Sequence, residues 1–137
     1  MPEQQKALAA LSEGLRKTGQ VEEALLTVNS AIARATDCGT TFDMAELLRI
    51  KAQVLAAIPQ YGRPAAMKCL MEALGIARKQ SALALELRST IALARSLIEG
   101  EEPDQARREL TLVYDRFTEG FETADLRMAR QLLDNLD

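Results

Sequence analysis

Small side chains recur along this chain at two sites that each repeat three times. The first set, spaced by 40 and 42 residues, comprises Ser12, Ala52 and Ala94. The second set, spaced by 42 and 40 residues, comprises Ala24, Ala66 and Ala106. Larger apolar residues flank both sets at helical spacing. Because small residues let two helices pack closely, each pair of sites predicts one helical hairpin.

The composition favours helices throughout. Alanine and leucine are abundant, glycine and proline number 7 and 4, and the aromatic residues are two tyrosines and three phenylalanines. Alanine and unbranched side chains lose little conformational entropy in a helix, whereas strands favour β-branched and aromatic runs that are absent here. The sequence therefore predicts an all-α fold.

Glycine, proline and capping residues divide the chain into seven expected helices. Their ranges are about 5–17, 21–37, 43–58, 64–79, 81–99, 104–118 and 123–136. The N-cap candidates are Thr40, Thr41 and Asp43 for the third helix, Ser81 for the fifth and Thr123 for the seventh. Gly120 is expected to close the sixth helix. In the first helix, Leu8, Leu11 and Leu15 form the expected apolar stripe.

These elements predict one domain over residues 1–137. We expect a right-handed α-solenoid of three hairpins, at about 3–38, 42–80 and 81–119, closed by a capping helix at about 123–136. The repeats resemble tetratricopeptide repeats, which place an aromatic residue, a Leu-Gly pair and a tyrosine on the first helix of each unit. Here leucine replaces most aromatics, serine or alanine replaces glycine, and the period is about 41 rather than 34.

A narrower resemblance concerns residues 43–137. The segments 66–80, 93–97, 112–121 and 123–136 are similar to the C-terminal repeat region of large bacterial signalling regulators. In those proteins a class III adenylate or guanylate cyclase domain, or a DNA-binding domain, precedes a predicted ATPase, and the repeats follow. The resemblance implies either a fragment of such a regulator or a free-standing relative. The cyclase and ATPase motifs are not in this sequence, so it implies no activity.

No set of residues suited to catalysis or cofactor binding appears. The chain has no histidine, which excludes Ser–His and Cys–His nucleophiles, and it has no phosphate-binding glycine loop. We therefore expect a non-enzyme with no catalytic residue, cofactor or metal. Cys38 and Cys69 are interpreted as structural thiols, kept reduced in the cytosol.

The net charge and the hydropathy pattern argue against three further classes of protein: nucleic-acid-binding, membrane-spanning and secreted proteins. A net charge of −3 and a pI near 5.1 argue against nucleic-acid binding, which needs a strongly basic face. No apolar run approaches the roughly 18 residues that a membrane helix requires. The N-terminus is amphipathic and charged, unlike a secretion signal. We expect a cytoplasmic protein with protein or peptide partners.

Polar residues beside the apolar stripe of each first helix are expected to line the concave face. The groove candidates are Arg16, Glu46, Arg49, Gln53, Arg88 and Arg95. Forked guanidinium donors on adjacent helices suit a peptide carboxylate. In the alternative interpretation these arginines are solvated and pair with Glu46, Glu86 or Glu99. Likewise, Tyr114, Phe117 and Phe121 either form an aromatic docking patch or seat the last helix.

Three functions are compatible with this pattern. The first is a non-catalytic interaction module that binds a peptide or sibling domain in its groove. The second is a homodimerisation scaffold, through which two copies of a larger regulator associate. The third is a small-molecule sensor that uses the same groove.

Overall fold

The computed structural model describes residues 2–39 and 41–137, and among these residues the regular secondary structure is all helical, with no strand. The seven α-helices are α1 (Glu3–Lys17), α2 (Val21–Asp37), α3 (Met44–Ala56), α4 (Gly62–Lys79), α5 (Leu83–Glu99), α6 (Pro103–Tyr114) and α7 (Ala124–Leu136). A short 3-10 turn, η1 (Thr41–Asp43), precedes α3. The expected all-α class and the seven helices are confirmed.

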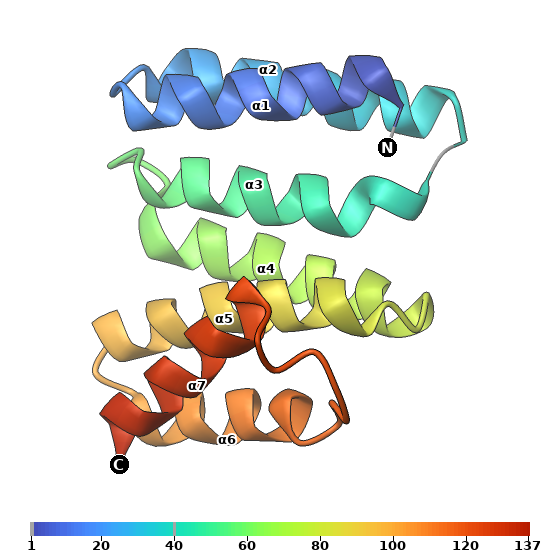
Figure 1. The fold of residues 1–137 in the computed structure, drawn as a ribbon. Helices are drawn as coiled ribbons and strands as arrows, with labels where there is room; N and C mark the ends of the chain where they lie inside the picture. Colours follow the sequence, from blue (N-terminus) through green and yellow to red (C-terminus); the bar gives the residue numbers. More distant parts are fainter. Residues whose placement is uncertain (1, 40) are drawn as a thin grey trace.

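Helices that follow one another pack as hairpins, α1 with α2, α3 with α4 and α5 with α6 (Figure 1). The odd-numbered helices also contact one another, α1 with α3, α3 with α5 and α5 with α7. Among the described residues, the even-numbered helices α2, α4 and α6 make no such contact with one another. The odd-numbered helices therefore lie closer together than the even-numbered ones. The last helix, α7, crosses obliquely over α5 and α6 (Figure 1).

All six small-residue sites are buried, as their threefold register predicts. Ser12, Ala24, Ala94 and Ala106 are 0% exposed, and Ala52 and Ala66 are 2% and 3% exposed. In the first hairpin the two sites touch directly, because Ser12 Oγ donates a hydrogen bond to the carbonyl oxygen of Ala24 across 2.8 Å. Because all six sites are buried, a side chain much larger than alanine at any of them would disturb the packing of the paired helices.

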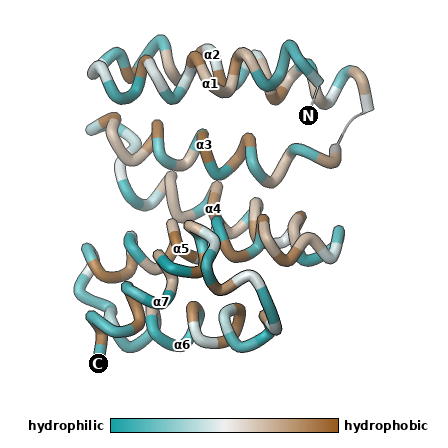
Figure 2. The backbone as a smooth tube through the Cα atoms, in the orientation of Figure 1, coloured by the Kyte–Doolittle hydropathy of each residue, from teal (hydrophilic) through white to brown (hydrophobic). Residues whose placement is uncertain are grey.

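The largest group of buried apolar side chains runs through the second and third hairpins and into α7. Leu74, Leu87 and Leu110 are among its most completely enclosed members. Two smaller groups hold the first hairpin against α3. Apolar positions recur along every helix rather than gathering in one element (Figure 2). Burial of side chains of this size contributes roughly 1.5–3 kcal/mol each and is the main stabilising term.

The expected apolar stripe of the first helix is wrong. The buried residues of α1 are Gln5, Ala9 and Ser12, whereas Leu11 is 53% exposed. Leu8 and Leu15 are only half-buried at the edge of the core. Ala9 and Ser12, two of these three buried residues, are short, which lets α1 approach its neighbours closely.

Ser81 does not cap α5. Its φ of 54° is left-handed, and the N–H of the next residue, Ala82, donates to the Ala77 carbonyl. This bond pattern ends α4 as a Schellman motif, and Ala82 occupies the N-cap position of α5. Asp43 and Thr123 do occupy N-cap positions, though without a side-chain capping bond. Thr40 lies outside the described residues, and Thr41 belongs to η1.

The sixth helix ends at Tyr114, earlier than its expected end near residue 118. After it, the N–H groups of Arg116 and Phe117 donate to carbonyls three residues back, which tightens the chain into turns. Gly120, with a φ of 78°, belongs to the following loop and does not close the helix. Two smaller differences concern the second hairpin, where α3 ends at Ala56 and α4 begins before Pro64.

Candidate functional site

The surface formed by α1, α3, α5 and α7, here called the odd-helix face, carries three adjoining depressions. They share lining residues, among them Arg49, Gln53 and Arg95, so they form one continuous hollow. All six groove candidates from the sequence lie here. The structure divides them into two groups, according to whether another side chain of the same face already binds them.

Arg49, Glu46 and Arg88 belong to a network of ion pairs that we call the charge ladder. Arg49 donates from Nη2 and Nε to the two carboxylate oxygens of Glu46, over 2.6 and 3.1 Å. Its Nη2 also lies 3.7 Å from Glu13 of α1. Arg88 donates to Glu46 over 3.4 Å and to Asp125 of α7 over 2.8 Å. The ladder thus links all four odd-numbered helices.

These contacts already occupy two of the three guanidinium nitrogens of each ladder arginine, Nε and Nη2 in Arg49 and Nε and Nη1 in Arg88. The side chains of Arg49 and Glu46 are each 15% exposed, so solvent screens their bidentate pair only partly. The pKa of Arg88 is raised, chiefly by its hydrogen bond to Asp125. The interpretation in which the arginines pair internally with Glu46 therefore holds for Arg49 and Arg88.

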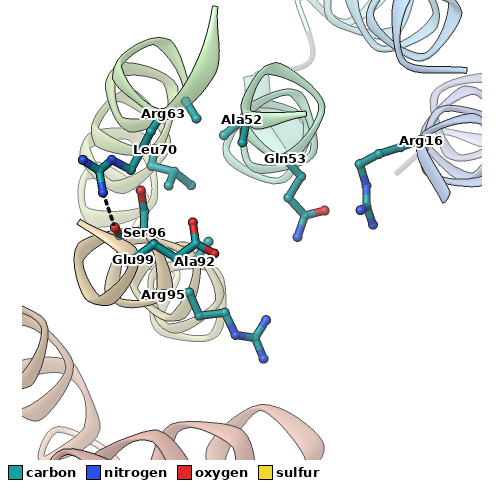
Figure 3. Close-up of a pocket in the computed structure, with 11 residues that line it drawn as sticks. Arg16, Ala52, Gln53, Arg63, Leu70, Ala92, Arg95, Ser96 and Glu99 are labelled. Carbon is teal, nitrogen blue, oxygen red and sulfur yellow. Dashed lines mark hydrogen bonds between the residues drawn. The ribbon is translucent and has the colours of Figure 1, made fainter. Parts of the chain in front are cut away.

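Arg16, Gln53 and Arg95 form the second group. Their side chains extend from α1, α3 and α5 toward one open space (Figure 3). No hydrogen bond or ion pair joins them to another described residue. The Nε of Arg16 is buried without an acceptor, an arrangement that costs roughly 1–3 kcal/mol when nothing satisfies it. Two guanidinium groups and an amide are thus left without a partner.

We call the depression around these three side chains the arginine pocket. Its volume is about 250 Å³. The remaining lining residues, drawn from α3, α4 and α5, are Ala52, Ala56, Arg63, Ala66, Leu70, Ala92, Ser96 and Glu99. Three arginines and one carboxylate make the lining positive, although the whole chain carries a net charge of −3.

Arg63 is a member of this pocket that sequence reasoning missed. Its Nη1 donates to the carbonyl oxygen of Ser96 over 3.4 Å, and its guanidinium lies over Gly100, in space that a side chain there would occupy. A cation beside the last carbonyls of α5 also complements the helix dipole. Arg63 lies in the first turn of α4, directly before Pro64, and its sequence neighbours give no sign that it reaches α5.

Comparison of the chain with family models, with curated proteins and with solved structures returned no match. In the described part of the chain, no three cysteine, aspartate or glutamate side chains are grouped as a metal site would require. Within the same residues, no helix combines the length and apolarity needed to cross a bilayer.

Glu86 and the aromatic residues that the sequence also singled out lie outside the arginine pocket. Glu86 does not pair with the groove arginines; its side chain, 5% exposed, accepts from Arg78 and Arg116 over 2.9–3.2 Å. Tyr114 and Phe117 pack against the main core, while Phe121 is 43% exposed with its ring centroid 5.8 Å from that of Tyr114.

Both cysteines are free thiols. Cys38 is exposed, whereas Cys69 is buried. Burial raises the pKa of the Cys69 thiol, which makes the reactive thiolate scarcer there. Neither residue lines the odd-helix face, so neither contributes chemistry to the candidate site.

Proposed function

We propose that the protein is a non-catalytic, cytoplasmic interaction module that binds a peptide or a sibling-domain segment along the odd-helix face. In this proposal the hairpins form a right-handed, tetratricopeptide-like solenoid whose concave side is that face. Contacts between odd-numbered helices, without matching contacts between even-numbered ones, support such curvature. The resemblance to the repeats of bacterial signalling regulators makes a role in signal transduction our working assignment.

The observation that carries the proposal is the unpartnered set Arg16, Gln53 and Arg95. Arginines that share a pocket repel one another, and a bound carboxylate would relieve that repulsion while supplying acceptors to their donors. The ladder arginines differ, because Glu46 and Asp125 already neutralise them. We therefore assign the main ligand contacts to the arginine pocket and a supporting role to the ladder.

Titration with a library of acidic peptides, followed by fluorescence anisotropy, tests this assignment. We expect Arg16→Ala and Arg95→Ala each to weaken binding about tenfold, as loss of a charge-assisted hydrogen bond does. Arg108→Ala, an exposed substitution on α6 with the same charge change, is the matched control and should bind normally. If both pocket variants bind the peptides as tightly as the wild type does, the groove is not the peptide-binding site and the proposal is wrong.

A second candidate function is homodimerisation. The observation that favours it is the exposed Leu11 on α1, flanked by the half-buried Leu8 and Leu15. Such a stripe on the first hairpin suits contact with a second copy. Light scattering across a concentration series tests for homodimerisation. A measured mass that rises from the monomer to the dimer value with concentration supports it, provided that Leu11→Glu restores the monomer mass. A constant monomer mass would exclude it.

A further inference from the structure

The arginine pocket is polar at its rim and apolar at its floor. Arg16, Gln53 and Arg95 stand at the rim, whereas Ala52 and Leu70 lie at the floor between α3 and α4 (Figure 3). Ala52 and Leu70 are 2% and 3% exposed, so they are continuous with the core. A ligand that enters the pocket therefore meets two different chemistries within one depression.

The floor is hollow because its residues are short. Ala52, Ala56, Ala66 and Ala92 supply four of the lining side chains, and a larger residue at Ala56 or Ala92, which are not buried, would fill space that is open here. The volume of about 250 Å³ is below the roughly 300–1,000 Å³ of pockets for drug-sized ligands. It suits a compact side chain of a partner better than a free cofactor or a large metabolite.

The rim selects the charge of the occupant. The lining holds three arginines and one carboxylate, Glu99, so the pocket attracts an anion. Arg16 and Arg95 have no partner within the described chain, and Arg63 is held by Ser96. A carboxylate is the acceptor that such donors bind best in a peptide.

From these two properties we propose that the arginine pocket recognises an acidic side chain adjacent to a compact aliphatic side chain. The carboxylate accepts hydrogen bonds from Arg16, Gln53 and Arg95, and the aliphatic group rests on the alanine floor. This inference rests on the proposed function, and it adds the chemistry that a partner segment must carry. The partner segment is thus defined by a pair of residues rather than by acidity alone.

Peptides that differ at one residue separate the two contributions. The probe is a ten-residue Gly/Ser peptide with a central Leu-Glu pair, compared with versions that carry Ser-Glu or Leu-Gln. We expect Ser-Glu and Leu-Gln each to bind about tenfold more weakly than Leu-Glu, for loss of apolar burial and loss of charge respectively. Affinity for Leu-Glu should also fall as salt is added, because Arg95 at the rim is exposed.

A substitution in the protein tests where the aliphatic group lies. Ala56→Leu adds bulk at an exposed residue that lines the pocket, so it should leave folding intact and remove the preference for Leu-Glu over Ser-Glu. Ala57→Leu, next to it but outside the pocket, is the matched control and should keep the preference.

The possible failures are distinct. Equal binding of Leu-Glu and Ser-Glu to the wild type, or no saturable binding of Leu-Glu at millimolar concentration, overturns the inference. A preference for Leu-Glu that survives in Ala56→Leu overturns it too, because the aliphatic group then lies elsewhere. If acidic library peptides still depend on Arg16 and Arg95, the proposed function stands without the inference. If the binding of acidic library peptides does not depend on Arg16 and Arg95, both the proposed function and the inference are wrong.

Discussion

Arg88 on α5 donates its Nε hydrogen to Oδ2 of Asp125 on α7 across 2.8 Å. The two side chains are 47% and 38% exposed, so this pair lies at the open surface of the odd-helix face. Asp125 thereby places a carboxylate from the protein's own last helix on an arginine that an acidic ligand would otherwise reach. If an acidic segment binds this face as proposed, α7 would compete with it for Arg88 at one end of the groove.

Removal of that competitor should strengthen binding. We expect Asp125→Ala to raise the affinity for acidic peptides about three- to tenfold, because Arg88 regains free donors. Fluorescence anisotropy against the peptides of the library measures the change. Asp134→Ala on the same helix is the control: it alters net charge equally, but Asp134 pairs with Arg130 at 3.1 Å instead. A rise of the same size in both variants would mean that only the overall charge matters.

The helix-ending turns predict stabilising substitutions. Ser81 and Glu101 adopt φ values of 54° and 62°, and each is followed by a residue whose N–H bonds back five residues, to Ala77 or Leu97. Gly19 occupies the same place after α1, with a φ of 84°. A left-handed backbone conformation costs a non-glycine residue about 1–2 kcal/mol. A substitution to glycine removes this strain, but glycine loses more conformational entropy on folding, which cancels part of the gain.

We therefore expect Ser81→Gly and Glu101→Gly each to stabilise the fold by about 0.5 kcal/mol. Together they should raise Tm by about 3 °C in thermal unfolding followed by circular dichroism. Gly19→Ala reverses the change at an equivalent turn where nothing lies within 4 Å of the added carbon, so it isolates backbone strain. That variant should lower Tm; a neutral result there, with no gain from the glycines, would refute the strain argument.

Simultaneous removal of Arg78 and Arg116, the two partners of the buried Glu86 carboxylate, should destabilise the fold. The side chain of Glu86 is 5% exposed, and with Arg78→Ala and Arg116→Ala combined it loses the two partners that offset its desolvation. We expect a loss of about 2 kcal/mol, below the roughly 3–5 kcal/mol of a fully buried pair because both arginines are about half exposed.

Urea unfolding measures this loss, and Glu86→Gln in the same background should recover part of it, because a neutral amide costs less to bury. Arg108→Ala combined with Arg127→Ala, two exposed arginines, serves as the comparison. If the two double variants unfold at the same urea concentration, the Glu86 cluster contributes nothing specific to stability.

Local pattern was enough to predict the helical class, the number of helices and the close-packed sites of the hairpins. Ser12, Ala52 and Ala94 are buried because their spacing repeats the period of a structural unit, and periodicity is a property of the sequence. The same reasoning failed for Leu11, since an amphipathic pattern shows that a helix has an apolar side without showing which side its neighbours cover.

What only the tertiary structure decided is which charges are already paired. The sequence by itself places Arg49, Arg88, Arg16 and Arg95 on the same side of the odd-numbered helices. It cannot tell that Asp125, from a different helix, reaches Arg88, or that Arg63 turns to Ser96 while Arg16 and Arg95 meet no acceptor. Ion pairing depends on distances of a few ångströms between side chains far apart in the chain, and packing alone sets those distances.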